Sequence, residues 1–204
     1  MKRLFFLFVF AMAAVSAKAD APVILVYGDS ISAAYGLKNV GDGWVELLRT
    51  RLKEQGYVYQ VVNASVSGET TAGGLARLPR ALQVQHPKVL VLELGGNDGL
   101  RALPIAQMRA NISQMIDLGA AAGAKVLLLG MRMPPNYGPE FTEQFHAVFT
   151  GLAREKKTAL VDFLLDGTAL DPNLIQADDI HPNVAAQPIL LNNVWPALKP
   201  LLQK

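Results

Sequence analysis

The stretch VILVYGDSIS, residues 23–32, decides the expected fold, because an apolar run passes directly into a polar turn. The run at residues 23–27 is typical of a strand that is buried on both faces of a parallel sheet. Gly28, Asp29 and Ser30 then lie at the carboxyl end of this strand, which is where open α/β sheets bind ligands. We therefore expect an α/β fold with a site at this turn.

Apolar runs alternate with segments of helical periodicity along the rest of the chain, as in parallel sheets with crossover helices. Further strands are expected at residues 57–62, 89–94, 125–131 and 159–161. One helical face is expected from Trp44, Leu47, Leu48 and Leu52, and another from Ile105, Met108, Ile112, Met115 and Ile116. Three more helices are expected around residues 71–83, 139–156 and 184–202. Because no repeat or linker interrupts this order, we expect residues 20–204 to form one domain with a five-stranded parallel sheet.

The first residues have the features of an export signal. A basic start at residues 1–3 precedes an apolar run at 4–15, and Ala17-Lys18-Ala19 fits a signal peptidase site. We expect residues 1–19 to be removed as a signal peptide and the mature protein to be periplasmic or secreted. A retained anchor is disfavoured, because a spanning helix needs about 20 apolar residues and Lys18 interrupts this run.

Composition excludes several classes of function. The chain has 19 Lys and Arg against 17 Asp and Glu, and removal of the signal peptide takes away Lys2, Arg3 and Lys18. A nearly neutral mature chain without a basic stripe argues against nucleic acid as a partner. The absence of cysteine excludes disulfides, thiolate metal sites, a cysteine nucleophile and the lipid-bearing cysteine of a lipoprotein. We expect the mature protein to be a monomer that lacks a membrane-spanning segment.

Ser30 is the candidate nucleophile because of its place at a strand end. The alternative is that Asp29 and Ser30 only cap the turn that follows. A serine hydroxyl attacks an acyl carbon only when a base takes its proton, so a histidine oriented by a carboxylate is required elsewhere.

Of the three histidines, His181 is the candidate base. His86 lies at a turn between an expected helix and strand, and His146 lies within an expected helix, so both are expected to be surface or partly exposed residues. His181 stands in a polar loop, two and three residues after a pair of acids. Spacing alone leaves open whether Asp178 or Asp179 orients the ring.

Acyl transfer also requires donors for the oxyanion that forms on the attacked carbonyl. Gly68 follows the second expected strand and offers a backbone N–H, whereas Asn97 follows the third and offers a side-chain amide. Taken singly, Gly68 and Asn97 could each equally well serve only to form a turn between a strand and a helix. Three strand ends with suitable residues on one sheet edge favour an active site. The chain lacks Gly-x-Gly-x-x-Gly, Gly-x-x-x-x-Gly-Lys and Gly-x-Ser-x-Gly, which argues against nucleotide sites and the α/β-hydrolase fold.

These residues resemble the four blocks of the GDSL or SGNH hydrolase family. The blocks are GDSIS at residues 28–32, Gly68, GGND at 95–98 and DDIHPN at 178–183. Within the family, the chain looks like the exported bacterial thioesterase I, protease I and lysophospholipase L1 group. The resemblance implies a flavodoxin-like three-layer α/β/α fold, no metal or cofactor, and hydrolysis of aryl esters, lysophospholipids and acyl thioesters.

The resemblance also implies a role for each site residue. Ser30 would be the nucleophile, and its N–H, that of Gly68 and the Asn97 side chain would form the oxyanion hole. His181 would be the base. Asp178 would orient it, because the family places its aspartate three residues before the histidine. The neighbouring acid, Asp179, occupies a position where many relatives have glycine.

The acyl pocket is expected beside residues 99–104, which gives Leu100, Leu103 and Tyr137 as substrate contacts, with packing under a loop as their alternative role. The loop at residues 131–138 is expected to form a wall of the site. Two other functions remain open. One is an esterase of the same fold acting on acetylated carbohydrates, and the other is a ligand-binding module without turnover.

Overall fold

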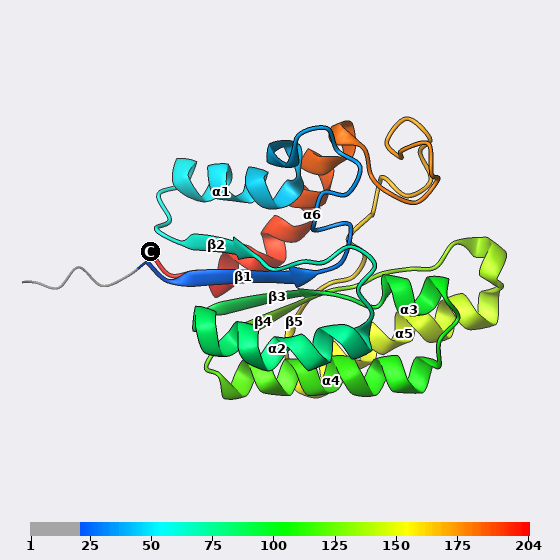
Figure 1. The fold of residues 1–204 in the computed structure, drawn as a ribbon, viewed down its shortest axis with the longest axis horizontal. Helices are drawn as coiled ribbons and strands as arrows, with labels where there is room; N and C mark the ends of the chain where they lie inside the picture. Colours follow the sequence, from blue (N-terminus) through cyan, green and yellow to red (C-terminus); the bar gives the residue numbers. More distant parts are fainter. Residues whose placement is uncertain (1–20) are drawn as a thin grey trace, which may run out of the picture.

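The structure is a computed structural model that describes residues 21–204, so the expected signal peptide at residues 1–19 lies outside the described residues. In the described part, five parallel strands form one sheet in the order β2-β1-β3-β4-β5 (Figure 1). The strands are β1 (Val23–Gly28), β2 (Gln60–Asn63), β3 (Val89–Glu93), β4 (Lys125–Leu129) and β5 (Ala159–Val161). The expected five-stranded parallel sheet is confirmed.

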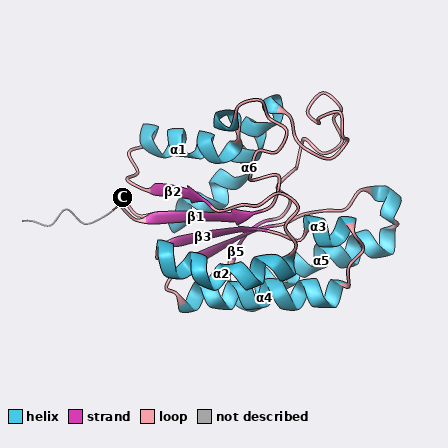
Figure 2. Ribbon diagram, in the orientation of Figure 1, coloured by secondary structure: helices cyan, strands magenta, loops and turns pink. Residues whose placement is uncertain are grey.

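Helices cover both faces of this sheet. The α-helices are α1 (Trp44–Glu54), α2 (Thr71–Gln85), α3 (Gly96–Leu100), α4 (Ile105–Ala121), α5 (Pro139–Lys156) and α6 (Gln187–Leu198). Short 3-10 helices are η1 (Val40–Asp42), η2 (Pro135–Tyr137), η3 (Val184–Ala186) and η4 (Lys199–Leu201). Helices α1 and α6 lie on one face, and α2, α4 and α5 lie on the other (Figures 1 and 2). The expected three-layer α/β/α arrangement is therefore confirmed.

The core forms where the apolar helix faces meet the sheet. Strands β1 and β3 are almost entirely buried because they are covered on both faces, as their continuous apolar runs predict. Helix α1 contributes the fully buried Trp44 and Leu48, and α4 contributes Ile112 and Met115. Trp195 is only partly buried at the edge of this core, where its ring meets Tyr57 edge-on with centroids 6.1 Å apart.

Several boundaries differ from the sequence prediction for physical reasons. Strand pairing begins only at Gln60, whose N–H donates to the Pro22 carbonyl at 2.9 Å, so the preceding residues remain outside the sheet. The helix expected at residues 184–202 is split, because a 3-10 turn capped by Asn183 precedes α6 and Pro188 lies in the first turn of α6. The short helix α3 was not predicted.

The order of the strands determines where the site lies. β1 pairs with β2 on one side and with β3 on the other, so the direction in which strands are added to the sheet reverses at β1. The segments that follow β1 and β3 therefore leave toward opposite faces of the sheet. The carboxyl ends of β1 and β3 adjoin, with Gly28 beside Glu93. Across residues 21–204, no helix combines the length and the apolar character needed to cross a bilayer.

Candidate active site

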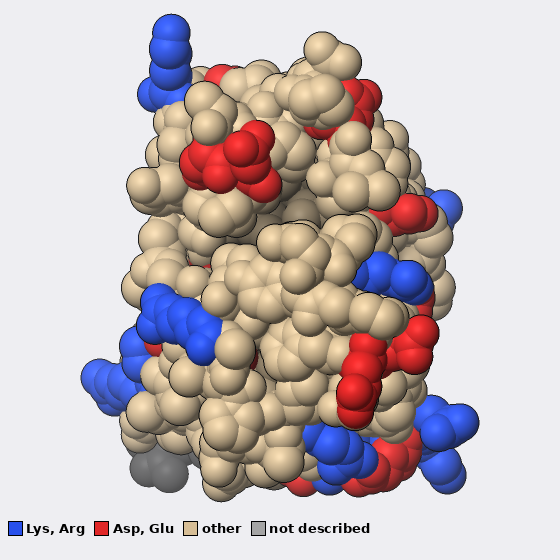
Figure 3. All heavy atoms as spheres, turned by 90° about the vertical axis from the view of Figure 1, so that its right-hand side faces the viewer, with Lys and Arg blue, Asp and Glu red and all other residues tan. Residues whose placement is uncertain are grey.

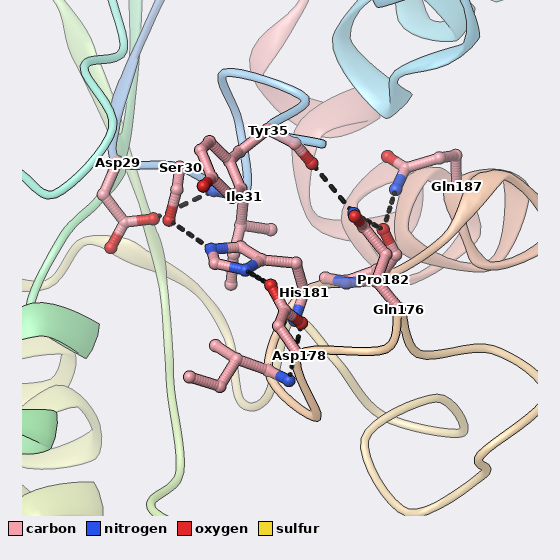
Figure 4. A network of polar contacts seen from close by, with 10 residues as sticks. Asp29, Ser30, Ile31, Tyr35, Gln176, Asp178, His181, Pro182 and Gln187 are labelled. Atoms are coloured by element: carbon pink, nitrogen blue, oxygen red, sulfur yellow. Dashed lines mark hydrogen bonds and ion pairs between the residues drawn. The ribbon is translucent and has the colours of Figure 1, made fainter. Parts of the chain in front are cut away.

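Ser30 lies in the turn that follows β1. This turn is closed by backbone hydrogen bonds from Ala33 N to Asp29 O and from Tyr35 N to Ser30 O, both 3.0 Å long. The Ser30 hydroxyl donates to Nε2 of His181 at 2.9 Å (Figure 4). These two residues are 151 positions apart in the chain, and the structure brings them into direct contact.

Asp178 accepts a hydrogen bond from the other ring nitrogen of His181. The Nδ1–H of His181 donates to Asp178 Oδ2 at 2.5 Å, and the backbone N–H groups of Ile180 and His181 donate to Oδ1, each at 3.0 Å. Partial burial raises the pKa of this carboxyl, but the hydrogen bonds from His181 and Ile180 outweigh it and lower the pKa to about 2. An ionised Asp178 fixes the proton on Nδ1, so Nε2 is the acceptor in the hydrogen bond with the Ser30 hydroxyl.

Asp179 does not make this contact. Its backbone has φ of 61°, in the left-handed region that favours glycine and tolerates Asp and Asn. Its N–H donates to the Gln176 carbonyl at 3.1 Å, so the residue closes the loop that carries the histidine. The geometry thus assigns different tasks to the two adjacent acids.

Gln176 connects this loop to the nucleophile turn. Its Nε2 donates to the carbonyl of Tyr35 at 2.8 Å and to that of Pro182 at 3.0 Å, and its backbone N–H donates to the His181 carbonyl at 2.7 Å (Figure 4). The Tyr35 ring lies 4.7 Å from the His181 ring between centroids. Sequence reasoning missed both residues, because neither stands in a pattern that predicts a contact.

The backbone supplies two free donors near the serine. Within residues 21–204, the N–H groups of Ser30 and Gly68 donate no hydrogen bond, and both residues line the same cavity. Gly68 has φ of 79°, a conformation that glycine adopts without strain. Its carbonyl accepts from Nη2 of Arg101 at 3.0 Å, which holds the peptide in place. Arg101 was not singled out from the sequence.

Asn97 brings a third donor to the same place. It lies in the first turn of α3, immediately after β3, and its Nδ2 donates to Oδ2 of Asp29 at 3.1 Å. Because the amide nitrogen carries two hydrogens, one N–H remains for a ligand in the cavity. Ser30, Gly68 and Asn97 together can therefore surround a negatively charged oxygen.

A cavity of about 650 Å³ opens beside Ser30 at the carboxyl ends of the strands (Figure 3). Apart from the polar residues described above, its walls are mainly apolar. One part of the lining comes from Leu100, Met131, Met133, Pro134 and Pro135, and a later segment of the chain contributes Phe163, Leu165, Ala169, Leu170, Ile175 and Ile180. Residues 131–135 thus form a wall, whereas the contribution of residues 163–170 was not predicted.

The three residues expected to contact substrate occupy different places. Leu100 lines the cavity. Leu103 is 38% exposed and lies outside the lining. Tyr137 also lies outside it: its hydroxyl donates to the Leu100 carbonyl at 3.0 Å, and its ring stacks on Phe141 with centroids 5.9 Å apart. For Tyr137 the arrangement is the packing under a loop considered as its alternative role.

Comparison with known proteins identifies the family. Residues 26–188 match the profile of the GDSL-like Lipase/Acylhydrolase family. The chain belongs to this family. It is therefore an enzyme of the ester hydrolase class, and the relation suggested by its sequence motifs is confirmed.

Individual relatives cover nearly the whole chain. The esterase TesA of Pseudomonas aeruginosa is 54% identical over 192 residues, which cover 94% of this chain and 95% of that protein. Thioesterase 1/protease 1/lysophospholipase L1 of Escherichia coli is 38% identical, with 97% and 92% covered. A crystal structure of a TesA protein superposes with a TM-score of 0.87 and 56% identity, covering 88% of this chain and 99% of that one.

The other two histidines of this GDSL-like hydrolase lie away from the serine. His86 ends α2 in a left-handed conformation with φ of 43°, as a surface residue at a helix end. His146 is partly buried on α5, where its Nε2 lies 3.1 Å from both Arg132 Nη2 and Asp162 Oδ1. Neither ring contacts Ser30, so their exclusion as the base agrees with the geometry.

Proposed function

We propose that this GDSL-like hydrolase is an exported serine esterase and acyl-thioesterase that forms an acyl-enzyme on Ser30. The observation that carries the proposal is the chain of contacts from Asp178 through His181 to Ser30, with distances of 2.5 and 2.9 Å. This arrangement has the orienting acid, base and nucleophile of a serine hydrolase in hydrogen-bonding order.

In the acylation step, Oγ of Ser30 attacks the carbonyl carbon of the ester or thioester while its proton passes to Nε2 of His181. The carbonyl oxygen becomes an oxyanion, which accepts hydrogen bonds from the N–H groups of Ser30 and Gly68 and from the Asn97 amide. The bond to the leaving oxygen or sulfur then breaks. His181 gives its proton to the leaving group, and the acyl group remains on Ser30.

In the deacylation step, water enters the place of the leaving group. His181 takes a proton from this water as its oxygen attacks the acyl carbon, and the same three donors hold the second oxyanion. The bond between the carbonyl carbon and Oγ breaks, His181 returns the proton to Ser30, and the carboxylic acid leaves. Asp178 stabilises the imidazolium in both steps.

The cavity supports apolar acyl groups as substrates. A mainly apolar space of about 650 Å³ beside Ser30 favours burial of an acyl chain through the hydrophobic effect, at about 25 cal/mol per Å² of apolar surface. The names of the relatives, esterase TesA and thioesterase 1/protease 1/lysophospholipase L1, support esters, thioesters and lysophospholipids as candidates. Export is supported by the signal-like residues 1–19.

A fluorophosphonate probe tests the nucleophile directly. We expect the wild type to be labelled on Ser30, and both Ser30→Ala and His181→Ala to lose about 10⁴–10⁶ in turnover of a nitrophenyl ester. A burst of nitrophenol in the wild type would exclude a binding module without turnover. Equal labelling of the wild type and Ser30→Ala would show that the nucleophile is elsewhere.

A substrate panel tests the acyl preference. With one preparation, we expect higher kcat/KM for nitrophenyl esters with acyl chains longer than acetyl, and turnover of acyl thioesters and lysophospholipids. A preference for acetylated sugars over all longer esters would favour the carbohydrate acetyl esterase instead. Detection of the mature N-terminus at Asp20 in a periplasmic fraction or in the medium would test export.

A further inference from the structure

A buried acid lies directly behind the oxyanion hole, and the reaction steps above do not use it. Asp29 is 2% exposed and uses both carboxylate oxygens as acceptors. Oδ1 accepts from the backbone N–H of Ile31 at 3.1 Å, and Oδ2 accepts from Nδ2 of Asn97 at 3.1 Å. Only a carboxylate can accept at both positions, because an amide offers one acceptor and one donor.

A second buried acid lies beneath Asp29 in the sheet. Glu93 at the end of β3 is fully buried, and its Oε2 accepts from the Asp29 backbone N–H at 3.1 Å and from the Ser32 hydroxyl at 2.8 Å. Its Oε1 has no hydrogen-bond partner within residues 21–204. Glycine is required at position 28, because a Cβ there would overlap the Glu93 carboxyl.

The pKa values of both buried acids are raised. Burial raises the pKa of Asp29 to about 6, opposed by the hydrogen bonds from Ile31 and Asn97 and by the charge of His181. Burial and the nearby charge of Asp29 raise the pKa of Glu93 well above its ordinary value. With a pKa of about 6, Asp29 is a carboxylate at neutral pH. Burial of a charge costs free energy. The buried carboxylate of Asp29 contacts the Asn97 amide, which belongs to the proposed oxyanion hole.

We propose that Asp29 is a positioning residue that fixes the amide of Asn97 for oxyanion stabilisation. By accepting one hydrogen of Nδ2, Asp29 prevents the amide from flipping its oxygen into the cavity and aims the second N–H at the place of the oxyanion. The inference rests on the proposed function, since it requires an oxyanion to form beside Ser30. It also gives the aspartate of the GDSIS segment a task beyond the capping of its turn.

A double-mutant cycle tests this coupling. We expect Asn97→Ala to lower kcat by about 10²–10³, the usual effect of losing an oxyanion donor, and Asp29→Asn to lower it by about 10–10² with little change in KM. If Asp29 acts through Asn97, adding Asp29→Asn to Asn97→Ala should cost little more. The proposal would be overturned if the losses of kcat in the two single variants multiplied in the double variant, or if kcat in Asp29→Asn were unchanged.

Asp98→Asn is the matched control for a merely structural effect. Asp98 is also a buried acid on α3, next to Asn97, and accepts from the N–H and hydroxyl of Thr71 at 2.8 and 2.5 Å. The same isosteric change there should lower the free energy of unfolding but leave kcat nearly as in the wild type. An equal loss of kcat in Asp98→Asn and Asp29→Asn would assign the effect to general loosening of α3.

A measurement without the Asp29 variant covers the case in which it fails to fold. In His181→Ala, where the histidine cannot titrate, the side-chain amide resonances of Asn97 should shift as Asp29 is protonated below about pH 6. Resonances that do not respond between pH 7 and 4 would contradict the contact. Fluorophosphonate labelling of wild-type Ser30 tests the proposed function separately, so the two can fail independently.

Discussion

The two halves of the proposed active site are held in different ways. On the nucleophile side, Asp29 is 2% exposed and lies at the end of the central strand β1, where Gly28 adjoins Glu93 of β3. On the base side, the Asp178 side chain is 39% exposed and belongs to an irregular loop. The sheet holds the nucleophile side through buried packing, whereas a few identifiable hydrogen bonds hold the base. Substitutions that disturb the packing beneath the nucleophile turn, such as Gly28→Ala, should therefore act first on stability, whereas substitutions in the loop that carries the base should act first on turnover.

Among the residues that support the proposed nucleophile and base, the largest expected effect is in the loop that carries Asp178. Asp178→Asn should lower kcat by about 10⁴, as loss of the orienting carboxylate does in other triads. The reason is that Nδ1 of the histidine loses its acceptor, and the ring is then no longer held in the tautomer that leaves Nε2 unprotonated. Stability at neutral pH should fall only in part, because the asparagine Oδ1 can still accept from the backbone N–H groups of Ile180 and His181. The neighbouring Asp179→Asn is the control, since asparagine tolerates its left-handed backbone. Within residues 21–204, the ring nitrogens of His181 bond to Asp178 and Ser30 and not to Asp179. Similar losses in both variants would contradict the division of tasks between these acids.

A methyl group on the sheet side should act on stability first. In Gly28→Ala, the added Cβ would overlap the Glu93 carboxyl and lie 3.0 Å from the Ser32 hydroxyl, which should lower the free energy of unfolding by about 1–3 kcal/mol. Urea unfolding measures this change. Gly151→Ala is the control, because its Cβ would meet nothing within 4 Å and alanine favours the interior of α5. Equal stability of the two variants would weaken the comparison.

A smaller effect on turnover is expected at Gln176. In Gln176→Ala, the side-chain bonds to the carbonyls of Tyr35 and Pro182 are lost, and the histidine loop separates more easily from the nucleophile turn. We expect kcat to fall about tenfold and the free energy of unfolding by about 1–2 kcal/mol. Gln144→Ala removes only an exposed contact to Glu140 on the same helix and should leave both quantities unchanged.

The two sides should also respond to pH in opposite directions. The pKa of Asp178 is lowered, so its contribution to stability is complete above about pH 4 and is lost as the pH falls toward 2. The pKa of Asp29 is raised to about 6, so the unfolded chain releases this proton first and the free energy of unfolding falls as the pH rises from about 4 to 6. Urea unfolding across pH should show the second slope in the wild type and a weaker one in Asp29→Asn.

Sequence reasoning reached the parts of the molecule that have a pattern. β5 at residues 159–161 and α5 at residues 139–156 have the expected bounds. The strand is marked by a short apolar run, and the helix begins at a proline. Ser30 and His181 could be proposed from a strand end and from elimination among three histidines. The contact between them is seen only in the fold.

Residues outside such patterns could not be predicted. Gln176, Arg101 and Phe163 stand in loops, where no periodicity indicates which partner a side chain will meet. Tyr137 was expected at the substrate from the family resemblance, and its ring stacks on Phe141, a contact that no sequence pattern indicates. These positions are set by tertiary contacts between distant segments, which a single sequence does not encode in local spacing.

The unequal composition of the cavity walls has a consequence for how such an enzyme can diversify. The wall at residues 131–135 contains none of the residues proposed to move protons, whereas the second wall, at residues 163–180, belongs to the same irregular segment as Asp178 and His181. Mutations at Met133 or Pro134 can reshape the space for an acyl group while the proton relay keeps its geometry. Mutational libraries aimed at new substrates should therefore yield more active variants from the first wall than from the second.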